Sequence, residues 1–418
     1  MNERLHAPRG TYDVLPEDHA ARGPVLRVAE TILERAGYRR IETPVFEHTE
    51  LFARGVGAST DIVQKEMYTF DDGGGRSLTL RPEGTASICR AYVDHGMHKL
   101  PQPVKVWYYG PFFRYERAQA GRYRQFWQIG AEAIGSDAPA LDAEVIVLLA
   151  TILDELEVGG LRLRIGSLGS PETRAAYREE LQGHLRRHEG RLSEDVRARI
   201  DLNPLRAFDS DHPGTREVMA TAPLLLDRLS AEDAEHFAEV RALLDAVELP
   251  YEVDPTLVRG LDYYARTVFE FTSDALGAQS GVGGGGRYDG LISQLGGQET
   301  PACGWAAGVE RMLLAAGDRP AAAPIVDLYL AVDGGEAARL RAFRIVAEAR
   351  RAGLAAQGEL AGRSLKGQLK QASRLSARYV AIVDDTGQVR LKDMDAAEQQ
   401  EISDVDVVAH VLRGRGIR

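Results

Sequence analysis

The chain has 418 residues, of which 44% are hydrophobic and 27% are charged. These proportions are close to those of globular proteins and disfavour a disordered, collagen-like or coiled-coil chain, and the length predicts two or three domains. The net charge of −11 argues against a protein that holds nucleic acid mainly through a bulk positive field.

The N-terminal ten residues are charged and lack the apolar segment of a secretion signal, and no stretch reaches the ~18 apolar residues of a membrane-spanning helix. The two cysteines, Cys89 and Cys303, lie far apart and outside any metal-ligand spacing. We therefore expect a cytoplasmic protein with no membrane segment, no disulfide framework and no protein-built metal site.

Before residue 320, long helical patterns alternate with strands that are neighbours in sequence. In chain order, the predicted elements are a helix at Asp18–Ala36, an extended run at Gly37–Pro44, strands at Ser77–Leu80, Val104–Arg117 and Phe126–Ile134, and a helix at Asp142–Leu156. Strands joined by short loops favour an antiparallel sheet. Residues 1–320 are therefore expected to form an α+β domain, an antiparallel sheet flanked by helices.

Residues 171–250 differ from the rest of this region. They are charged and mostly helical in pattern, they lack the aromatic strands, and strand signals resume only after Tyr251. We interpret them as a helical insertion. His184 and His188 stand four residues apart here, but they lack a neighbouring glutamate and a third ligand, so a solvated helix is favoured over a zinc site.

A second domain is predicted after Gly317–Pro324, a Pro/Ala-rich stretch without periodicity that we interpret as a linker. Residues 325–418 carry 15 Lys and Arg against 13 Asp and Glu, so this part is slightly basic while the rest is acidic. Strands at Ile325–Val332 and Tyr379–Val383 alternate with helices at Ala337–Ala352 and Ser364–Leu375, which predicts a small α/β domain.

The stretch from Trp107 to Glu132 predicts a hairpin of two aromatic-rich strands with a basic tip. On the second strand, Trp127, Ile129, Ala131 and Ala133 share a core face, so Phe126, Gln128, Gly130 and Glu132 share the other. On the preceding strand, Arg114 and Glu116 are two residues apart and therefore share one face. The pattern predicts a polar binding floor; a solvated sheet face is the alternative.

Three further segments could carry chemistry. Arg259 precedes Gly260, where a guanidinium could clamp a phosphate or carboxylate, although a surface ion pair is the commoner fate of arginine. Gly281–Gly290 fits G-x-G-x-x-G but lacks both the βαβ context of a dinucleotide site and the lysine of a phosphate loop. Gly308–Arg311 leads small residues into a helix, which places Arg311 in its first turns; simple helix–sheet packing is the alternative.

Together these segments resemble the class II aminoacyl-tRNA synthetases, and within them the histidyl-tRNA synthetase family. The runs Gly37–Pro44, Phe113–Phe126 and Gly308–Arg311 resemble the three motifs of the class. Leu257–Tyr264 (LVRGLDYY) and Gly285–Leu291 (GGRYDGL), with Arg81–Thr85 beside them, resemble the more specific histidine signatures. The resemblance covers essentially the whole chain.

The resemblance implies a histidine–tRNA ligase. Such an enzyme joins L-histidine to ATP as histidyl-adenylate, releases pyrophosphate, and then transfers histidine to the 3′ end of histidine tRNA. Mg²⁺ would bridge the outer phosphates of ATP, and the first motif would form a homodimer. Residues 1–320 would be the catalytic domain and residues 325–418 an anticodon-binding domain.

The resemblance also implies roles for individual side chains. Histidine binding is implied for Glu83, Thr85, Arg114, Gln128, Glu132, Arg259, Tyr263, Tyr264 and Tyr288; ATP binding for Arg114, Glu116, Arg122, Phe126 and Arg311; and tRNA binding for Arg117, Gln119, Arg363, Lys366 and Lys370. Arg114 and Arg259 would be the catalytic pair at the α-phosphate. Glu132 and Tyr264 would meet the two imidazole nitrogens, one a donor and one an acceptor.

Two other classes of protein are alternatives to a synthetase. The regulatory subunit of ATP phosphoribosyltransferase resembles a synthetase and binds histidine, but such proteins typically lack the tail domain and lose the catalytic arginines. This chain keeps Arg114, Arg259, Arg311 and residues 325–418. A pure RNA-binding scaffold would leave the polar floor unexplained.

Overall fold

The computed structural model describes residues 4–57, 60, 62–117, 119–277, 280–317 and 326–414. The chain divides into two compact units, Met1–Arg319 and Pro320–Arg418. The predicted linker, Gly317–Pro324, lies outside the described residues from position 318 onward. Within the described ranges, no helix is long and apolar enough to cross a membrane.

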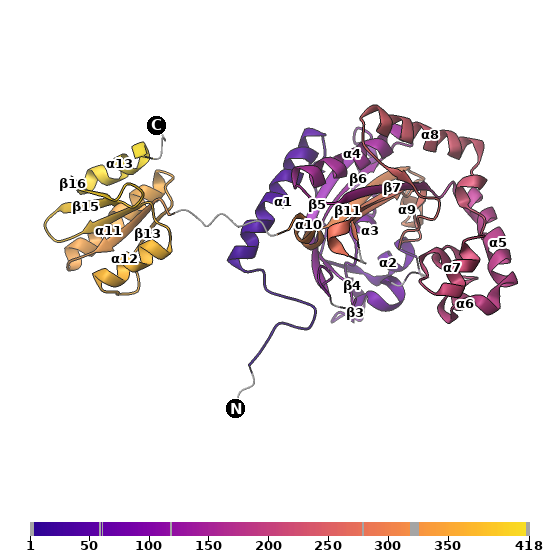
Figure 1. The fold of residues 1–418 in the computed structure, drawn as a ribbon, viewed down its shortest axis with the longest axis horizontal. Coiled ribbons are helices and arrows are strands. Elements are labelled where there is room, and N and C mark those ends of the chain that lie inside the picture. Colours follow the sequence, from indigo (N-terminus) through magenta and orange to yellow (C-terminus); the bar gives the residue numbers. More distant parts are fainter. Residues whose placement is uncertain are drawn as a thin grey trace. The chain divides into compact units, whose positions relative to one another are not determined.

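An eight-stranded sheet forms the centre of the first unit (Figure 1). Its strands, in spatial order, are β1 (Arg39–Arg40), β5 (Val104–Phe113), β6 (Gln125–Ile134), β11 (Ala302–Gly308), β10 (Gly281–Arg287), β9 (Ala265–Ser273), β7 (Leu161–Ser167) and β8 (Glu252–Val253). The inner strands pair antiparallel, and only the short edge strands β1 and β8 pair parallel. The predicted antiparallel sheet flanked by helices is therefore confirmed.

Two apolar cores lie on opposite faces of this sheet. On one face α1 (Pro16–Arg35), α4 (Pro139–Glu155) and α10 (Val309–Ala316) cover Ile129, Ala131 and Ala133, so the predicted core face of β6 is confirmed. On the other face α3 (Thr85–Asp94) packs with Val104, Val106 and Ile134. A small sheet, β2 (Phe46–His48), β4 (Ser77–Leu80) and β3 (Tyr68–Asp71), precedes α3, with α2 (Thr49–Gly55) between β2 and β3.

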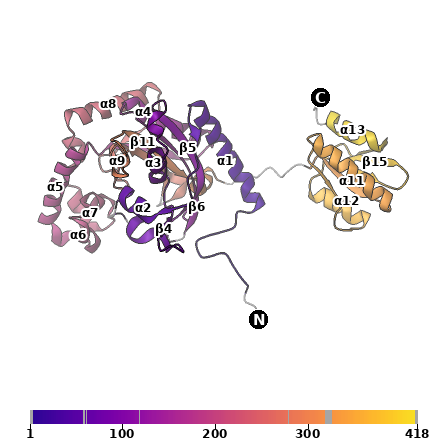
Figure 2. The same cartoon turned by 180° about the vertical axis from the view of Figure 1, so that it is seen from behind.

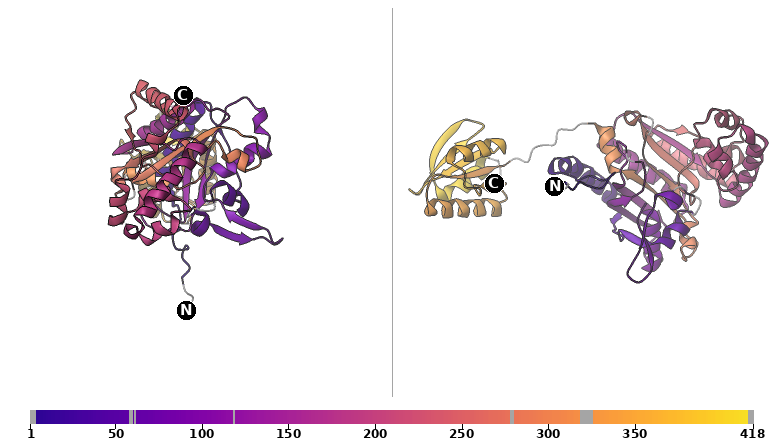
Figure 3. Two further views of the ribbon diagram at one scale, coloured as in Figure 1. Left: turned by 90° about the vertical axis from the view of Figure 1, so that its right-hand side faces the viewer. Right: turned by 90° about the horizontal axis from the view of Figure 1, so that it is seen from below.

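The segment 171–250, called the insertion below, is helical between β7 and β8. It contains α5 (Pro171–Arg187), α6 (Glu194–Arg199), α7 (Pro213–Met219) and α8 (Ala231–Ala246). Helices α5, α6 and α7 group at the end of this unit away from α1 (Figure 2), and Figure 3 shows them projecting from one side of the sheet. His184 is buried and its Nε2 lies 3.0 Å from the Val218 carbonyl, so it belongs to the packed face of a helix whose other faces are largely exposed.

The second unit has a five-stranded sheet in the order β13-β12-β14-β15-β16. Its elements are β12 (Leu328–Val332), α11 (Glu336–Arg351), β13 (Ala356–Gly358), α12 (Leu365–Arg374), β14 (Tyr379–Val383), β15 (Gln388–Asp393), β16 (Glu398–Ser403) and α13 (Val407–Gly414). Strands β13, β12 and β14 are parallel, as expected for alternating strands and helices, and the antiparallel pair β15 and β16 is an addition that the patterns did not predict.

One further expectation is corrected. The strand predicted to run to Arg117 ends at Phe113, because the Tyr115 amide donates to the Glu66 carbonyl and leaves the hairpin ladder. The glycine-rich stretch Gly281–Gly290, to which the sequence patterns assigned no element, contains strand β10 in the middle of the sheet.

Candidate active site

Small residues on one face of the sheet make room for two large polar side chains. In register across β5, β6, β11 and β10 lie Tyr108, Gly130, Ala306 and Gly284. A Cβ at position 130 would lie 2.2 Å from the Tyr108 ring. In the next row a Cβ at Gly304 would lie 1.8 Å from Glu132 Oε2. Glycine at both positions is therefore what lets the phenol and the carboxylate lie flat on the sheet.

A cavity of about 180 Å³ opens above this floor. The loop between β8 and β9, the start of α3 and the sheet itself enclose it. Its lining residues are Ile62, Glu83, Gly84, Thr85, Tyr108, Arg114, Gln128, Arg259, Gly260, Leu261, Tyr263, Tyr264, Gly284, Tyr288, Gly304, Trp305 and Ala306. Eight of the nine side chains expected to bind histidine thus line one cavity, and the ninth, Glu132, lies just beneath it.

Glu132 is fully buried, so the alternative of a solvated sheet face is wrong. Thr85 donates its hydroxyl to Glu132 Oε1 at 2.8 Å, and Tyr288 donates to Oε2 at 2.5 Å. Burial raises the pKa of Glu132 to about 8, although both hydrogen bonds oppose that shift. Burial thus favours the protonated form of this carboxyl group more than in an exposed glutamate, and two hydroxyl groups fix its position.

Glu83 closes the N-terminus of α3. Its two carboxylate oxygens accept the backbone amides of Thr85 at 2.7 Å and Ala86 at 2.9 Å, which otherwise lack helical partners. Burial raises its pKa despite these bonds. These bonds hold the acid at the cavity wall.

Arg259 reaches the cavity from the loop between β8 and β9. Its Nη1 donates to Glu270 Oε1 at 2.7 Å, and a Cβ at Gly284 would lie 3.0 Å from its Nη2. The buried atoms of cavity-lining residues that have no hydrogen-bond partner within the described ranges include Arg259 Nε and Gln128 Oε1. Buried polar atoms are normally satisfied, so a free donor and a free acceptor in one cavity indicate a place for a polar ligand.

The residues expected to bind ATP gather where β5 and β6 join. The Arg114 guanidinium lies 5.3 Å from the Phe126 ring centroid, and its Nε donates to the Pro82 carbonyl at 2.8 Å. Glu116 accepts from Arg122 at 3.1 Å. Arg311 lies in the first turn of α10 and donates to the Gly281 carbonyl.

The residues expected to bind tRNA are exposed in both units. Arg117 and Gln119 lie at the hairpin tip, where the backbones of Gln119 and Arg122 pair with each other. In the second unit Lys366 and Lys370 are exposed one turn apart on α12, and Arg363 lies just before it. No group of three or more His, Cys, Asp or Glu side chains in the described part of the chain could hold a metal ion.

Sequence reasoning missed several residues of the cavity, namely Tyr108, Gly284, Gly304 and Trp305. One signal was available for Tyr108, because a glycine on the neighbouring strand leaves room for a large ring. No local signal marks Gly284 or Gly304, since their role depends on strands that pair across long sequence distances.

Comparisons with known proteins agree with this geometry. The family model described as "Histidyl-tRNA synthetase" matches residues 10–312. The histidine–tRNA ligase of Desulforamulus reducens is 48% identical over 95% of this chain and 96% of its own length. The crystal structure of apo Staphylococcus aureus histidyl-tRNA synthetase superposes with a TM-score of 0.82 at 35% identity, covering 98% of this chain and 100% of that one.

A Bacillus halodurans structure titled as an ATP phosphoribosyltransferase regulatory subunit/histidyl-tRNA synthetase has a TM-score of 0.66 at 22% identity, with 92% of this chain and 100% of that one covered. At that identity it shows the shared fold alone.

The antiparallel sheet, its polar cavity and the second sheet unit define a class II aminoacyl-tRNA synthetase. Because the family model spans most of the chain and the relatives match over nearly its full length, the chain belongs to the histidyl-tRNA synthetase family.

Proposed function

We propose that this chain is a histidine–tRNA ligase that activates L-histidine in the cavity above β6. The observation that carries the proposal is the arrangement along one face of that strand. Buried Glu132 lies at one end, and Phe126, beneath the Arg114 guanidinium, lies six residues away at the other. Six residues of strand span ~20 Å, which accommodates an amino acid joined to a nucleotide.

The acidic end suits the imidazole and the ammonium group of histidine. Glu132 accepts a hydrogen bond from one imidazole nitrogen and the Tyr264 phenol meets the other, while Glu83, Thr85 and Gln128 hold the amino group. Tyr263 and Tyr288 complete the wall around the ring. Leaving these groups unpaired would penalise an analogue without the matching donor and acceptor.

The arginine end suits the phosphates. The histidine carboxylate attacks the α-phosphorus, a carboxylate–phosphate bond forms, and the bond to the β-phosphate breaks to release pyrophosphate. Arg114 and Arg259 stabilise the charge that builds at the α-phosphate, where a preorganised donor is worth ~3 to 4 kcal/mol. The attacking carboxylate is already ionised, so positioning and electrostatics suffice for this step.

The hairpin and α10 supply the remaining ATP contacts. Glu116 accepts from the adenine amino group, Phe126 and Arg311 enclose the ring, and Arg122 meets the outer phosphates. Mg²⁺ enters with ATP as part of the substrate and neutralises phosphate charge. Glu116 and Arg122 pair with each other at 3.1 Å in the structure, so each is already held beside the site.

The decisive experiment is ATP–pyrophosphate exchange with each of the twenty amino acids. Exchange with histidine alone is expected. A pure, folded protein that exchanges with none of them would refute the proposed activity, and exchange with a different amino acid would refute the assignment of Glu132 and Tyr264 to the imidazole.

We also propose that the second unit binds the anticodon arm of histidine tRNA through Arg363, Lys366 and Lys370, while Arg117 and Gln119 meet the acceptor end. Residues 1–319 alone are expected to retain exchange but to charge tRNA at least ~10-fold more slowly, because phosphate contacts contribute much of the affinity for nucleic acid. Equal charging by the shortened and full chains would contradict this assignment.

The proposal includes a cytoplasmic homodimer formed around Gly37–Pro44. Strand β1 lies at the edge of the large sheet, and Arg39 and Arg40 are exposed there, which leaves this edge accessible to a second copy. Sedimentation equilibrium is expected to give twice the chain mass, and a monomer at micromolar concentration would contradict the dimer.

A further inference from the structure

We propose that the insertion acts on histidine recognition through two positioning residues, Arg174 and Asn203, which hold the loop Leu257–Tyr264. This inference rests on the proposed function, since it concerns how that site is assembled. Within the described residues, the insertion contributes no side chain to the cavity above β6. We therefore place its influence on histidine binding in the loop, which lines that cavity and also faces the insertion.

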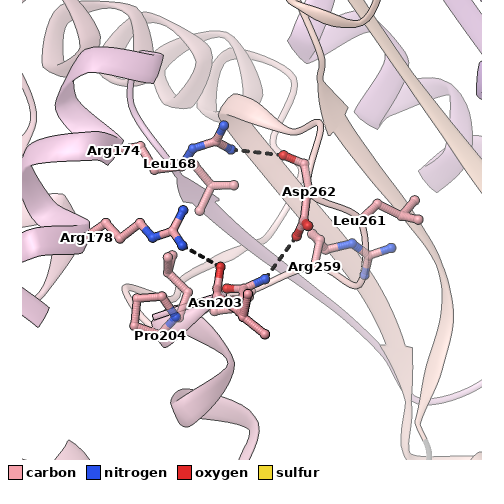
Figure 4. Close-up of a pocket in the computed structure, with 11 residues that line it drawn as sticks. Leu168, Arg174, Arg178, Asn203, Pro204, Arg259, Leu261 and Asp262 are labelled. Carbon is pink, nitrogen blue, oxygen red and sulfur yellow. Dashed lines mark hydrogen bonds between the residues drawn. The ribbon is translucent and has the colours of Figure 1, made fainter. Parts of the chain in front are cut away.

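The loop needs outside support because it has no regular structure of its own. Between β8 and β9 the chain forms neither helix nor strand. Leu257 and Tyr263 are buried at its two ends, but residues 258–262 are only partly covered. A second cavity of about 160 Å³ separates this stretch from the insertion (Figure 4). Polar contacts across this cavity therefore add to the apolar packing of Leu257, Leu261 and Tyr263 in positioning the loop.

Asn203 and Arg174 provide those contacts. Asn203 Nδ2 donates to Asp262 Oδ1 at 2.9 Å. Arg174, on α5, donates through Nη1 to the carbonyls of Asp262, at 3.3 Å, and Tyr264. The two carbonyls flank Tyr263, so one guanidinium fixes the backbone on both sides of a residue that lines the active-site cavity. Figure 4 shows Arg174 and Asn203 meeting Asp262 from the insertion side.

The segment that carries Asn203 is itself held to α5. Arg178 lies one turn after Arg174 and donates to the carbonyls of Asp201 and Leu202, each at 2.5 Å. A continuous set of hydrogen bonds thus runs from α5 through residues 201–203 to Asp262.

The opposite side of Asp262 is held by the first part of the chain. Its amide donates to the Val56 carbonyl at 3.3 Å, and a Cβ at Gly57 would lie 2.7 Å from its Oδ2. Asp262 is therefore clamped between the end of α2 and the insertion. Because Tyr263 and Tyr264 directly follow Asp262 and line the cavity, a shift of Asp262 displaces the wall of the histidine site.

The test exchanges the donor and the acceptor of this contact. Asn203→Asp places a second carboxylate against Asp262, and we expect the KM for histidine in ATP–pyrophosphate exchange to rise about tenfold, while the KM for ATP changes less than about twofold. In the double variant N203D/D262N the amide and carboxylate are interchanged, and we expect the KM for histidine to return to within about threefold of wild type.

Two further variants keep the result interpretable. Arg191→Ala removes an exposed ion pair with Glu217 elsewhere in the insertion and should leave both KM values unchanged. If N203D does not fold, Asn203→Ala replaces it, with an expected rise of about threefold in the KM for histidine. Thermal unfolding is measured for every variant.

The outcomes separate the two proposals. Absence of histidine-dependent exchange in the wild type would refute the proposed function. Normal wild-type exchange with an unchanged histidine KM in the Asn203 variant would overturn the positioning role, as would equal rises in both KM values or a double variant no better than N203D alone.

Discussion

Two arginines from the two histidine-type signature segments differ in how completely they are bound. Arg287, at the end of β10, has a fully buried side chain, and all three of its nitrogens have partners. These include the Asp142 carboxylate, Asp289 Oδ1 at 3.1 Å and the Ser136 carbonyl at 3.0 Å. Arg259 has a side chain that is 18% exposed and makes one ion pair, with Glu270, while its Nε has no partner among the described residues.

The difference separates a structural arginine from one that is available to a ligand. Arg287 joins the end of β10 to the start of α4, and burying it with a full set of acceptors leaves no donor for a substrate. Arg259 retains a buried donor beside the cavity, an arrangement that costs stability unless a ligand completes it. Two arginines that lie in similar signature segments of the sequence therefore have opposite roles.

The largest effect is expected for Arg287→Ala, which leaves the Asp142 carboxylate buried without its cation. Removing one partner of a buried pair typically costs ~3 to 5 kcal/mol. Urea unfolding should show that loss, with activity falling only as far as the folded fraction falls. Arg191→Ala, at an exposed ion pair, serves as the control and should unfold like wild type. Wild-type stability of R287A would contradict the structural role.

Arg259→Ala is expected to have the opposite effects, a large loss of activity with little loss of stability. Its partner Glu270 also lies 3.7 Å from Arg164, so the acid keeps a cation and stability should change little. Adenylate formation should fall at least ~100-fold, as for loss of a preorganised donor to a developing charge. Histidine binding should remain detectable by calorimetry. Exchange at the wild-type rate in this variant would refute the catalytic role of Arg259.

The contrast between the two arginines could not be predicted from the sequence. Asp142, which binds Arg287, stands 145 residues earlier, and no sequence pattern near Arg287 predicts this partner. The resemblance to a known family implied the role of Arg259, whereas its alternative as a surface ion pair is partly realised in the contact with Glu270. Whether all the hydrogen-bond donors of an arginine find acceptors depends on side chains that only the folded chain brings together.

The fold was predictable where strands carry alternating or continuously apolar side chains. Strands β6 and β14 follow the apolar patterns of Phe126–Ile134 and Tyr379–Val383 closely. Strand β10 was not, because its run of glycines has no side chains to show a period. Its conformation is imposed by its neighbours: a Cβ at Gly285 would lie 1.9 Å from the Gly304 carbonyl.

The face that carries Glu132 was predicted from strand parity, but its complete burial was not. Parity states which side of a sheet a residue occupies and not what covers that side. The cover comes from α3 and the loop before β9, elements that precede and follow β6 in the chain. The convergence of these residues on one cavity was thus predictable, while the enclosure that raises the pKa of Glu132 was not.

Glu132 combines the two properties that separate the arginines, since it is fully buried like Arg287 and adjoins the ligand cavity like Arg259. Burial raises its pKa to about 8, above the ordinary value of ~4.3 for an unfolded glutamate. The folded state therefore binds more protons than the unfolded state between these values, and the free energy of unfolding should fall as the pH rises through that window.

Glu132→Gln is expected to remove this pH dependence, because the amide resembles the protonated acid and does not titrate. Relative to the variant, the free energy of unfolding of the wild type should fall as the pH rises from 5.5 to 8. The fall is at most ~1.4 kcal/mol for each unit by which the pKa is shifted. The KM for histidine should rise about tenfold, since the carboxyl group can ionise when it accepts from the imidazole and the amide cannot. Chemical denaturation at several pH values measures the first effect and exchange kinetics the second. A wild type that gains stability relative to the variant as pH rises would show that Glu132 is ionised in the free protein, and the acid would then belong with Arg259, as a charge held ready for the ligand.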